Sequence, residues 1–258
     1  MDTEFDVTAP EWAEAPPWLS ARLALITEAG SHAYGLNTPE SDLDLRGIAL
    51  EPIDHVVGFT KKFEQYQKHT DAVDVCVFGL VKFCALAAQC NPNVLELLFV
   101  RDESVRHRTL VYDELRRYRG LFLSQKARHT FRGYAMSQLK KIRFKAEHGS
   151  TGKRKAVIEE FGWDVKHGMH LVRLMRMGEE LLRDGVLNVW RDDREELLAV
   201  RSGQWPLEDV IAWAEAKDIE LKDMPSSLPW GPPLEEIDRL CRNLLLASWR
   251  INLRVSDG

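Results

Sequence analysis

The chain has 258 residues, of which 45% are hydrophobic and 29% are charged, and its formal net charge is -5 at pH 7. These values are typical of a globular protein with one large domain or two small ones, and they exclude a chain that binds polyanions through its overall charge. The sequence has no run of roughly 18 apolar residues that could form a transmembrane helix, and its acidic start, Met1–Asp6, is not a secretory signal.

Four cysteines are spread along the chain, at Cys76, Cys84, Cys90 and Cys241. None of them forms a C-x-x-C pair, and three lie in apolar segments. This usage is typical of reduced thiols in the core of a cytosolic protein, and it argues against a zinc site. We therefore expect a cytoplasmic protein with no membrane partner, and the sequence leaves the oligomeric state open.

The first hundred or so residues alternate between strand-like and helix-like patterns. Residues 1–20 form an irregular, proline-containing acidic arm in which Trp12 and Trp18 are the candidates for packing against the body. Asn93 is a good N-cap for a helix that follows the break at Asn91–Pro92. The patterns predict strands over 21–28, 42–50, 63–68 and 72–78, a helical turn within 30–37, and helices over 79–89 and 93–99.

The stretch from Gly30 to Gly47 carries the most specific chemistry. It opens with the turn Gly30-Ser31, whose backbone N–H groups and hydroxyl can hold a phosphate. It ends with Asp42 and Asp44, which are two residues apart and so lie on one face of a strand. Two carboxylates on one face repel unless a cation lies between them, and Mg²⁺ prefers carboxylate and phosphate oxygens. The stretch therefore predicts a metal and phosphate site.

The same stretch resembles the signature of the DNA polymerase β superfamily of nucleotidyltransferases, which is Gly-Ser, a short helix, and Asp-x-Asp on the next strand. The resemblance implies transfer of a nucleoside monophosphate with Mg²⁺ or Mn²⁺ as the cofactor and an NTP, ATP first, as the substrate. It assigns Gly30 and Ser31 to the β- and γ-phosphates. His32 either contacts phosphate or fills the helical turn, and Tyr34 is a further nucleotide-binding candidate.

A third carboxylate usually completes such a site from a neighbouring strand, and Asp74 is the first candidate. An aspartate inside the apolar run Val73–Val77 is costly unless a partner or a metal compensates for its burial. The alternatives are a water-facing position for Asp74, or Asp71 as the third ligand. Arg46 shares the face of Asp42 and Asp44, and it suits either a phosphate contact or an ion pair with one of these aspartates. Of the two roles, we favour the ion pair.

The second half of the chain is mostly helical in pattern, with a short strand over 186–190 and a Pro-rich linker over 226–233. Helices are predicted over 108–127, 129–147, 164–183, 207–217 and 234–255. We therefore predict an α+β protein, with a small mixed β-sheet core and helices over 21–105, after the arm at 1–20, and a mostly helical domain over 106–258.

Two groups of basic residues stand out in the helical half. Lys166, His170 and Arg173 share one helical face, which suits a polyphosphate or a nucleic-acid backbone unless it is a solvated surface. A second group includes Lys145, with Phe144 interleaved among its basic residues, and it predicts a nucleic-acid footprint unless it is a flexible helix end. The footprint consists of Lys140, Lys141, Arg143, Lys153, Arg154 and Lys155.

Over roughly residues 23–205 the chain resembles a subgroup of predicted bacterial and phage nucleotidyltransferases, some of which are associated with RNA repair. The shared motifs lie in Gly30–Gly35, Ser41–Gly47, Asn91–Glu96 and Lys166–Leu174. Asn91, Asn93 and Glu96 are expected to brace the strand beneath the site. The resemblance implies Asp42, Asp44 and Asp74 as the catalytic metal ligands, and Lys166, His170 and Arg173 as nucleotide-binding residues together with Arg46.

The leading hypothesis is two-metal transfer of a nucleoside monophosphate to a hydroxyl of RNA, with release of pyrophosphate. A protein or small-molecule hydroxyl is the alternative acceptor, and the basic segment 140–155 is the feature that favours RNA. The alternative of another class is a non-catalytic module that binds nucleotide or RNA. The sequence leaves the base of the nucleotide and the use of a template open.

Overall fold

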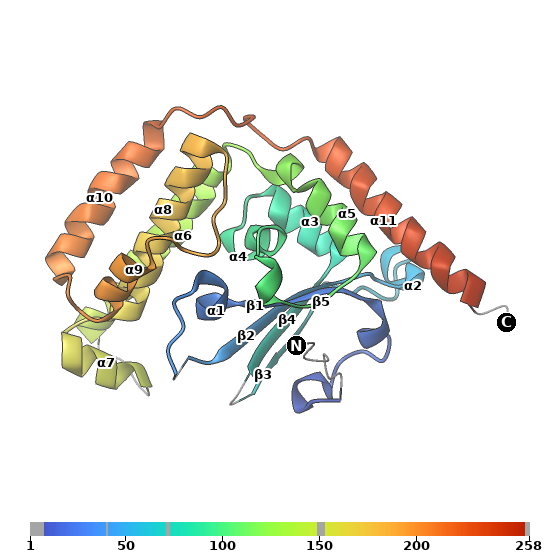
Figure 1. The fold of residues 1–258 in the computed structure, drawn as a ribbon, viewed down its shortest axis with the longest axis horizontal. Helices are drawn as coiled ribbons and strands as arrows, with labels where there is room; N and C mark the ends of the chain where they lie inside the picture. Colours follow the sequence, from blue (N-terminus) through green and yellow to red (C-terminus); the bar gives the residue numbers. More distant parts are fainter. Residues whose placement is uncertain (1–7, 40, 71–72, 149–152, 256–258) are drawn as a thin grey trace. The chain divides into compact units, whose positions relative to one another are not determined.

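The computed structural model describes residues 8–39, 41–70, 73–148 and 153–255, with the backbone alone at 146–147, 153–154 and 251–255. The chain forms two compact units (Figure 1). Unit 1 comprises Met1–Ala88, Asn93–Phe122 and Pro232–Gly258, and unit 2 comprises Gln89–Pro92 and Leu123–Gly231. No helix in the described part of the chain is both long and apolar enough to cross a lipid bilayer.

Unit 1 is built on a five-stranded mixed sheet of order β3-β4-β2-β1-β5. β2 and β4 pair in parallel, and the other neighbouring pairs are antiparallel. The mixed α+β core predicted from the sequence is therefore confirmed. The strands are β1 (Leu23–Ala29), β2 (Leu43–Ala49), β3 (Gln65–His69), β4 (Val73–Gly79) and β5 (Val105–Arg108).

The N-terminal segment covers one face of the sheet. Leu45, Val75 and Val77 alternate toward this face, and they pack in one core cluster with Trp12 and Leu19. The 3-10 turns in and after this segment are η1 (Pro10–Trp12) and η2 (Ser20–Arg22). Residues 8–20 thus pack as part of unit 1, because the apolar face of the sheet needs a cover.

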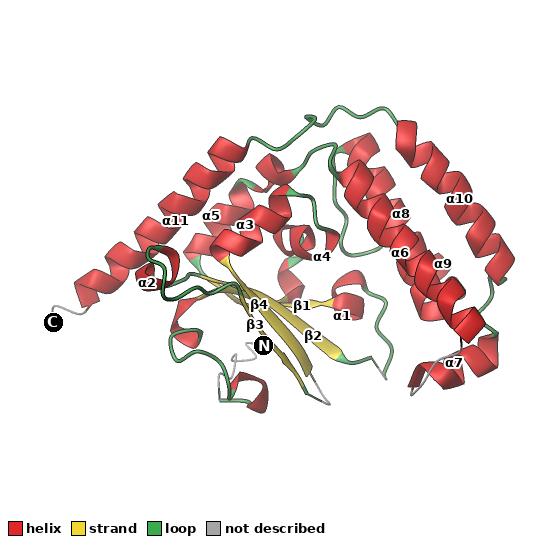
Figure 2. Cartoon of the chain, turned by 180° about the vertical axis from the view of Figure 1, so that it is seen from behind, coloured by secondary structure: helices red, strands yellow, loops and turns green. Residues whose placement is uncertain are grey.

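Helices lie on the other face of the sheet (Figure 2). α3 contacts β2 and β4, α5 contacts β1, and α11 contacts α3 and α5. The helices of this unit are α1 (Gly30–Tyr34), α2 (Ile53–Val56), α3 (Leu80–Ala88), α5 (Leu110–Arg117) and α11 (Leu234–Val255). The shorter turns are α4 (Pro92–Leu95), which begins at the boundary of the units, η3 (Glu96–Leu98), η4 (Asp102–Ser104) and η5 (Arg119–Phe122).

The position of α11 corrects the predicted domain boundary at residue 105. The C-terminal helix and residues 106–122 belong to the unit that contains the sheet. α11 buries Ile237, Leu244 and Leu245, and the indole of Trp249 donates a hydrogen bond to the carbonyl of Glu51 at 2.8 Å. A helix distant in the sequence therefore completes the helical layer, which a division by sequence order cannot predict.

Unit 2 is a helical bundle in which α8 occupies the centre. α8 packs against each of the other four helices, and α10 also contacts α6. Gly168 and Gly178 make these contacts close: a Cβ at Gly168 would lie 2.3 Å from the ring of Trp163, and one at Gly178 would lie 2.9 Å from Cβ of Phe131. The helices are α6 (Ala127–His148), α7 (Lys153–Phe161), α8 (Val165–Asp184), α9 (Arg194–Arg201) and α10 (Leu207–Asp223).

Some local predictions were wrong. Residues 186–190 form no strand, and the predicted helix over 108–127 is divided into α5 and η5 before α6 begins. β5, α7 and α9 were not predicted. Short elements such as β5 have weak periodicity, and their state is decided by the partner strand or helix that they pack against.

A buried carboxylate joins the sheet to the helical layer. Glu51 accepts hydrogen bonds from the backbone N–H groups of Leu80 at 2.9 Å and Val81 at 3.2 Å, and so caps the start of α3. Burial raises the pKa of Glu51, while these two N–H groups and the charge of Arg22 favour its ionised form. Arg22 also donates to the carbonyl of Leu50 at 2.6 Å, beside the capped helix.

Replacing Glu51 by alanine leaves the first N–H groups of α3 without their acceptor. We expect Glu51→Ala to lower the free energy of unfolding by about 1–3 kcal/mol, as measured by urea denaturation. Glu103, whose side chain is 74% exposed in the same unit, supplies the matched control Glu103→Ala, for which we expect a change below about 0.5 kcal/mol. Equal losses in the two variants would contradict the capping role.

Candidate active site

The Gly30-Ser31 turn follows β1 directly and opens the short helix α1. Gly30 has φ +56°, in the left-handed region that favours glycine. A Cβ at this position would lie 2.0 Å from a carboxylate oxygen of Asp44. Glycine is therefore needed twice, for the turn itself and for the close approach of the Asp44 carboxylate to the backbone.

Asp44 and Asp74 are brought together by strand register. β2 and β4 run in parallel, and Asp44 pairs directly with Asp74, so both side chains leave the same face of the sheet. This is the face on which α3 packs further along the strands. Asp42 precedes β2 and is exposed, and Asp71 lies outside the described residues. The structure thus places Asp74 directly beside Asp44, as the third carboxylate expected from a neighbouring strand.

Arg46 lies between the two carboxylates. Its guanidinium donates to a carboxylate oxygen of Asp74 at 2.9 Å and to the carbonyls of Asp74 and Leu45, each at 3.0 Å. The nearest oxygen of Asp44 is 3.6 Å from the same guanidinium. Arg46 therefore forms an ion pair, with Asp74 as its main partner and Asp44 as its second.

The donor set of this pair suits a hard divalent cation. Asp74 Oδ1 is buried and has no hydrogen-bond partner among the described residues, so one carboxylate oxygen is available beside Asp44. Carboxylate oxygens are the ligands that Mg²⁺ and Mn²⁺ prefer. Within the described part of the chain, however, no three His, Cys, Asp or Glu side chains are grouped closely enough to hold a metal. The two carboxylates of Asp44 and Asp74 are therefore the ligands that the described residues offer to a metal.

Tyr34 anchors α1 to the core. The residue is buried, and its hydroxyl donates a hydrogen bond to the carboxylate of Glu96, which is also buried. Glu96 begins η3, so this contact ties the helix after the Gly-Ser turn to the segment after Asn93. Glu96 was expected to brace the strand beneath the site, whereas the structure bonds it to the short helix α1, and it places Tyr34 inside the core.

His32 belongs to a second charged group. Its Nδ1 lies 4.0 Å from a carboxylate oxygen of Glu28, which also forms an ion pair with Arg106 on β5. Glu28 pairs with Leu45 in the sheet, so strand alternation puts it on the face opposite Asp44. The sequence reasoning missed Glu28 and Arg106, although an acidic residue near the end of an apolar strand was a signal for the first of them.

The predicted basic stripe on α8 is not one exposed face. Lys166 is exposed, but Arg173 is only 4% exposed and donates to the sulfur of Met177 at 3.1 Å. Burial and the nearby charge of Arg173 lower the pKa of His170 well below its usual value. The three side chains therefore form no single exposed face, because α8 is surrounded by other helices, and their role in nucleotide binding stays a prediction.

Part of this polar content has a structural role at the start of α8. Asp164 caps the helix by accepting from the backbone N–H of His167 at 3.1 Å. Lys145 on α6 reaches the same carboxylate at 2.7 Å and lies 3.1 Å from Nε2 of His167. Lys145 therefore stabilises the helical bundle. In this structural role it differs from the other residues of the predicted basic footprint.

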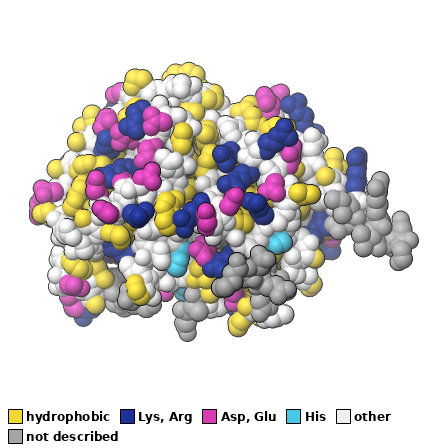
Figure 3. All heavy atoms as spheres, viewed as in Figure 1, with side chains coloured by type: hydrophobic (Ala, Val, Ile, Leu, Met, Phe, Trp, Pro, Cys, Tyr) yellow, Lys and Arg dark blue, Asp and Glu magenta, His cyan; other side chains and the backbone are white. Residues whose placement is uncertain are grey.

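The remaining basic residues of the footprint lie on α6 and α7. Lys140 and Lys141 are exposed, Arg143 pairs with Glu215 at 2.9 Å, and Lys155 lies 3.6 Å from Glu159. The side chains of Lys153 and Arg154 are outside the described residues. Acidic and basic side chains are interspersed over the face drawn in Figure 3. The exposed lysines on α6 are the strongest part of the predicted footprint.

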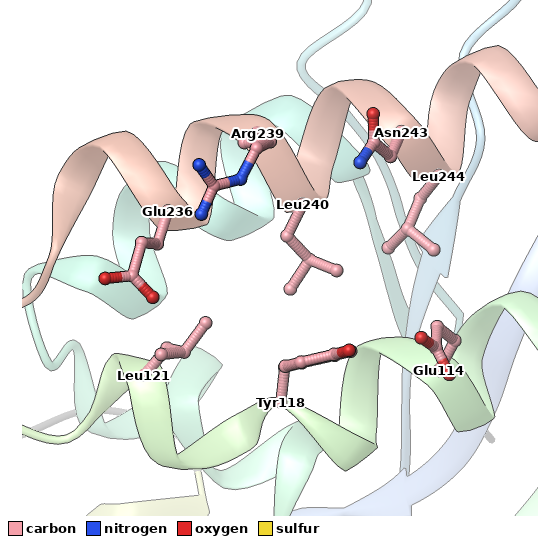
Figure 4. Close-up of a pocket in the computed structure, with 8 residues that line it drawn as sticks. All are labelled: Glu114, Tyr118, Leu121, Glu236, Arg239, Leu240, Asn243 and Leu244. Carbon is pink, nitrogen blue, oxygen red and sulfur yellow. The ribbon is translucent and has the colours of Figure 1, made fainter.

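A separate pocket of about 350 Å³ in unit 1 contains none of the predicted site residues. It lies between α11 and the α5–η5 segment, and Leu240 and Leu244 point from α11 toward Tyr118 and Leu121 (Figure 4). Glu114, Glu236, Arg239 and Asn243 complete the lining. Its apolar floor is formed by helices of the outer layer, away from the strand residues Asp44 and Asp74.

Two known proteins are similar to parts of this chain. The chain is 30% identical over 143 residues to an uncharacterized 38.9 kDa protein of Enterobacteria phage T4, in a match that covers 51% of this chain and 40% of the phage protein. The chain therefore spans less than half of that relative's length. A nucleotidyltransferase-like protein from Exiguobacterium sibiricum 255-15 aligns over 88% of this chain and 69% of its own, with 11% identity and a TM-score of 0.27.

A family model matches most of the chain. The model describes the RNA repair pathway DNA polymerase beta family, and it matches residues 11–225. The matched range includes the Gly30-Ser31 turn, the Asp44–Asp74 pair with Arg46, and the whole of α8. The chain therefore belongs to the RNA repair pathway DNA polymerase beta family, and with it to the nucleotidyltransferases of the polymerase β superfamily.

Proposed function

We propose that this protein transfers a nucleoside monophosphate from an NTP, with ATP as the expected donor, to a hydroxyl at an RNA end. The observation that carries the proposal is the in-register pair of Asp44 and Asp74 beside the Gly30 turn, with one oxygen of Asp74 left without a hydrogen-bond partner in the described structure. A nucleotidyltransferase needs carboxylates of this kind beside a phosphate-binding turn.

In this reaction the acceptor oxygen forms a bond to the α-phosphorus, and the bond from that phosphorus to the bridging oxygen breaks. Pyrophosphate leaves with the electron pair, and the proton of the acceptor passes to a carboxylate of the site or to water. Asp44 and Asp74 would hold Mg²⁺ or Mn²⁺, with Asp42 as a candidate third ligand. When bound, such ions stabilise charge on the phosphates and lower the pKa of the acceptor hydroxyl.

The other residues of the turn would bind and orient the nucleotide. Gly30 lets the backbone approach the phosphates without a side chain, and Ser31 supplies a hydroxyl beside them. Arg46 keeps the Asp74 side chain in one orientation through its two contacts with that residue. Tyr34, through Glu96, holds the turn itself in place.

RNA is the acceptor that we favour. The family description refers to an RNA repair pathway, and the exposed Lys140 and Lys141 on α6 supply positive charge in a protein whose net charge is -5. A protein or small-molecule hydroxyl would not need these lysines. Transfer to protein, or binding of nucleotide without transfer, is therefore a distinct outcome of the test that follows.

Removing either paired carboxylate should abolish transfer. We expect Asp44→Ala and Asp74→Asn each to lower the transfer of label from α-phosphate-labelled ATP to total cellular RNA by about 100-fold or more, since each removes a ligand of the metal ions that would stabilise charge on the reacting phosphate. Asp192 is exposed in unit 2, and Asp192→Asn should retain full transfer. Circular dichroism checks that each variant is folded.

Two results would contradict the proposal. Label that appears in protein instead of RNA would overturn the acceptor. Equal inactivity of the wild type and both variants on RNA, tRNA and protein, with ATP still bound, would favour the non-catalytic module.

Arg46 should compete with a divalent cation for the two carboxylates. Without a cation, Arg46→Gln leaves Asp44 and Asp74 facing each other, so we expect its melting temperature in EDTA to fall by about 2–4 °C, the shift for roughly 1 kcal/mol in a unit of this size. We also expect Mg²⁺ to raise the melting temperature of Arg46→Gln by more than that of the wild type.

The exposed Arg242, which pairs with Asp238 at 2.9 Å on α11, supplies the control Arg242→Gln. This variant should melt like the wild type with and without Mg²⁺. If Mg²⁺ shifts neither the wild type nor Arg46→Gln, Asp44 and Asp74 do not bind the cation.

A further inference from the structure

A pocket of about 670 Å³ lies wholly within unit 2, where the start of α6 meets the end of α10 and the segment that follows it. Four of its lining side chains are basic or can become so, and one is acidic, Asp223. The basic side chains are Lys126, Arg128, His129 and Lys222. None of these residues was singled out in the sequence, and none belongs to the site around Asp44.

The wall of this pocket is held by hydrogen bonds to backbone carbonyls. Arg128 donates to the carbonyls of Leu221 at 2.8 Å, Lys222 at 3.1 Å and Met224 at 2.7 Å. Gln125 donates to the carbonyl of Leu228 through its side chain at 2.8 Å. Its backbone N–H also reaches the carbonyl of Pro229 at 2.8 Å. The segment after α10 is therefore a fixed frame, which lowers the entropic cost of binding a ligand.

Trp230 lies in the segment after α10, lines the pocket and is 84% exposed. An indole left in water on a braced segment is a ready surface for a flat aromatic ligand. The nearby charge is positive: Lys126 donates to the neutral amide of Gln89 at 2.9 Å, and Lys222 is exposed. An exposed indole beside lysines is the combination that binds single-stranded nucleic acid, through stacking on bases and attraction of phosphates.

We propose that this pocket binds a nucleotide of single-stranded RNA, with its base on Trp230 and its neighbouring phosphates at Lys126 and Lys222. The inference rests on the proposed function, in which RNA is the acceptor. It adds a second contact with that RNA, separate from the reacting carboxylates. An acidic peptide could use the lysines, but it would leave the indole without a stacking partner.

The test measures RNA affinity alone, in EDTA and without NTP, by fluorescence anisotropy of a labelled single-stranded RNA of about 12 nucleotides, within the usual site size. Trp230→Ala should weaken binding about 10-fold, which is within the range for loss of one stacked base. Trp230→Phe should restore most of the affinity, because it keeps an aromatic face. Lys222→Glu should weaken binding and reduce the dependence of affinity on salt by about one phosphate contact.

Matched controls come from exposed residues of unit 1. Phe59 is 98% exposed, and the side chain of Lys62 is 78% exposed, so Phe59→Ala and Lys62→Glu remove comparable groups elsewhere. Both controls should bind RNA as the wild type does. Because Trp230 is so exposed, its replacement should not affect folding, and circular dichroism checks this for each variant.

Several outcomes would overturn the inference. Trp230→Ala with the affinity of the wild type, or a wild type that does not bind RNA, would each reject an RNA site here. Competition by polyglutamate that depends on Lys222 but not on Trp230 would assign the pocket to acidic peptides. Loss of RNA binding in Trp230→Ala, with no nucleotidyl transfer by the wild type, would support the pocket and reject the proposed reaction alone.

Discussion

The chemistry of unit 1 depends on two aspartates that the sheet places in direct register. Parallel pairing of β2 and β4 sets Asp44 beside Asp74, on strands about 4.8 Å apart. Two carboxylates at this separation repel each other, and the chain offsets the repulsion with Arg46, which binds both. Gly30 completes the arrangement, since any side chain there would collide with Asp44. Charge and backbone shape thus constrain the same few residues.

The rest of unit 1 supports that end of the sheet from both faces. The N-terminal segment packs Trp12 and Leu19 on one face, and α3, α5 and α11 cover the other. Two buried carboxylates connect these layers: Glu51 caps α3 and reaches α11 through its carbonyl, and Glu96 holds Tyr34 of α1. Each buried acid has hydrogen-bond donors, as burial requires, and each therefore fixes the relative position of two elements.

Unit 2 separates structural charge from surface charge. Lys145, Asp164 and His167 form a buried group at the start of α8, and Arg173 is enclosed further along the same helix. The exposed lysines, Lys140 and Lys141, lie on the outer surface of α6. Basic residues that look alike in the sequence therefore have different roles. Those between helices specify the packing of the bundle, and those on its surface are free to meet a polyanion.

The sequence alone determined the class of the protein and the core of its site. The Gly30-Ser31 turn and Asp44 could be recognised because a turn and a strand alternation are local properties, and the apolar run around Asp74 identified it as a costly residue. The tertiary structure determined the features that depend on residues distant in the sequence. The register of β2 and β4 joined Asp74 to Asp44 and Arg46, the packing of α11 on α3 and α5 placed the C-terminal helix in the unit that contains the sheet, and enclosure of α8 buried Arg173. Periodicity within one segment reports which faces are apolar, but only the fold determines which neighbour covers them.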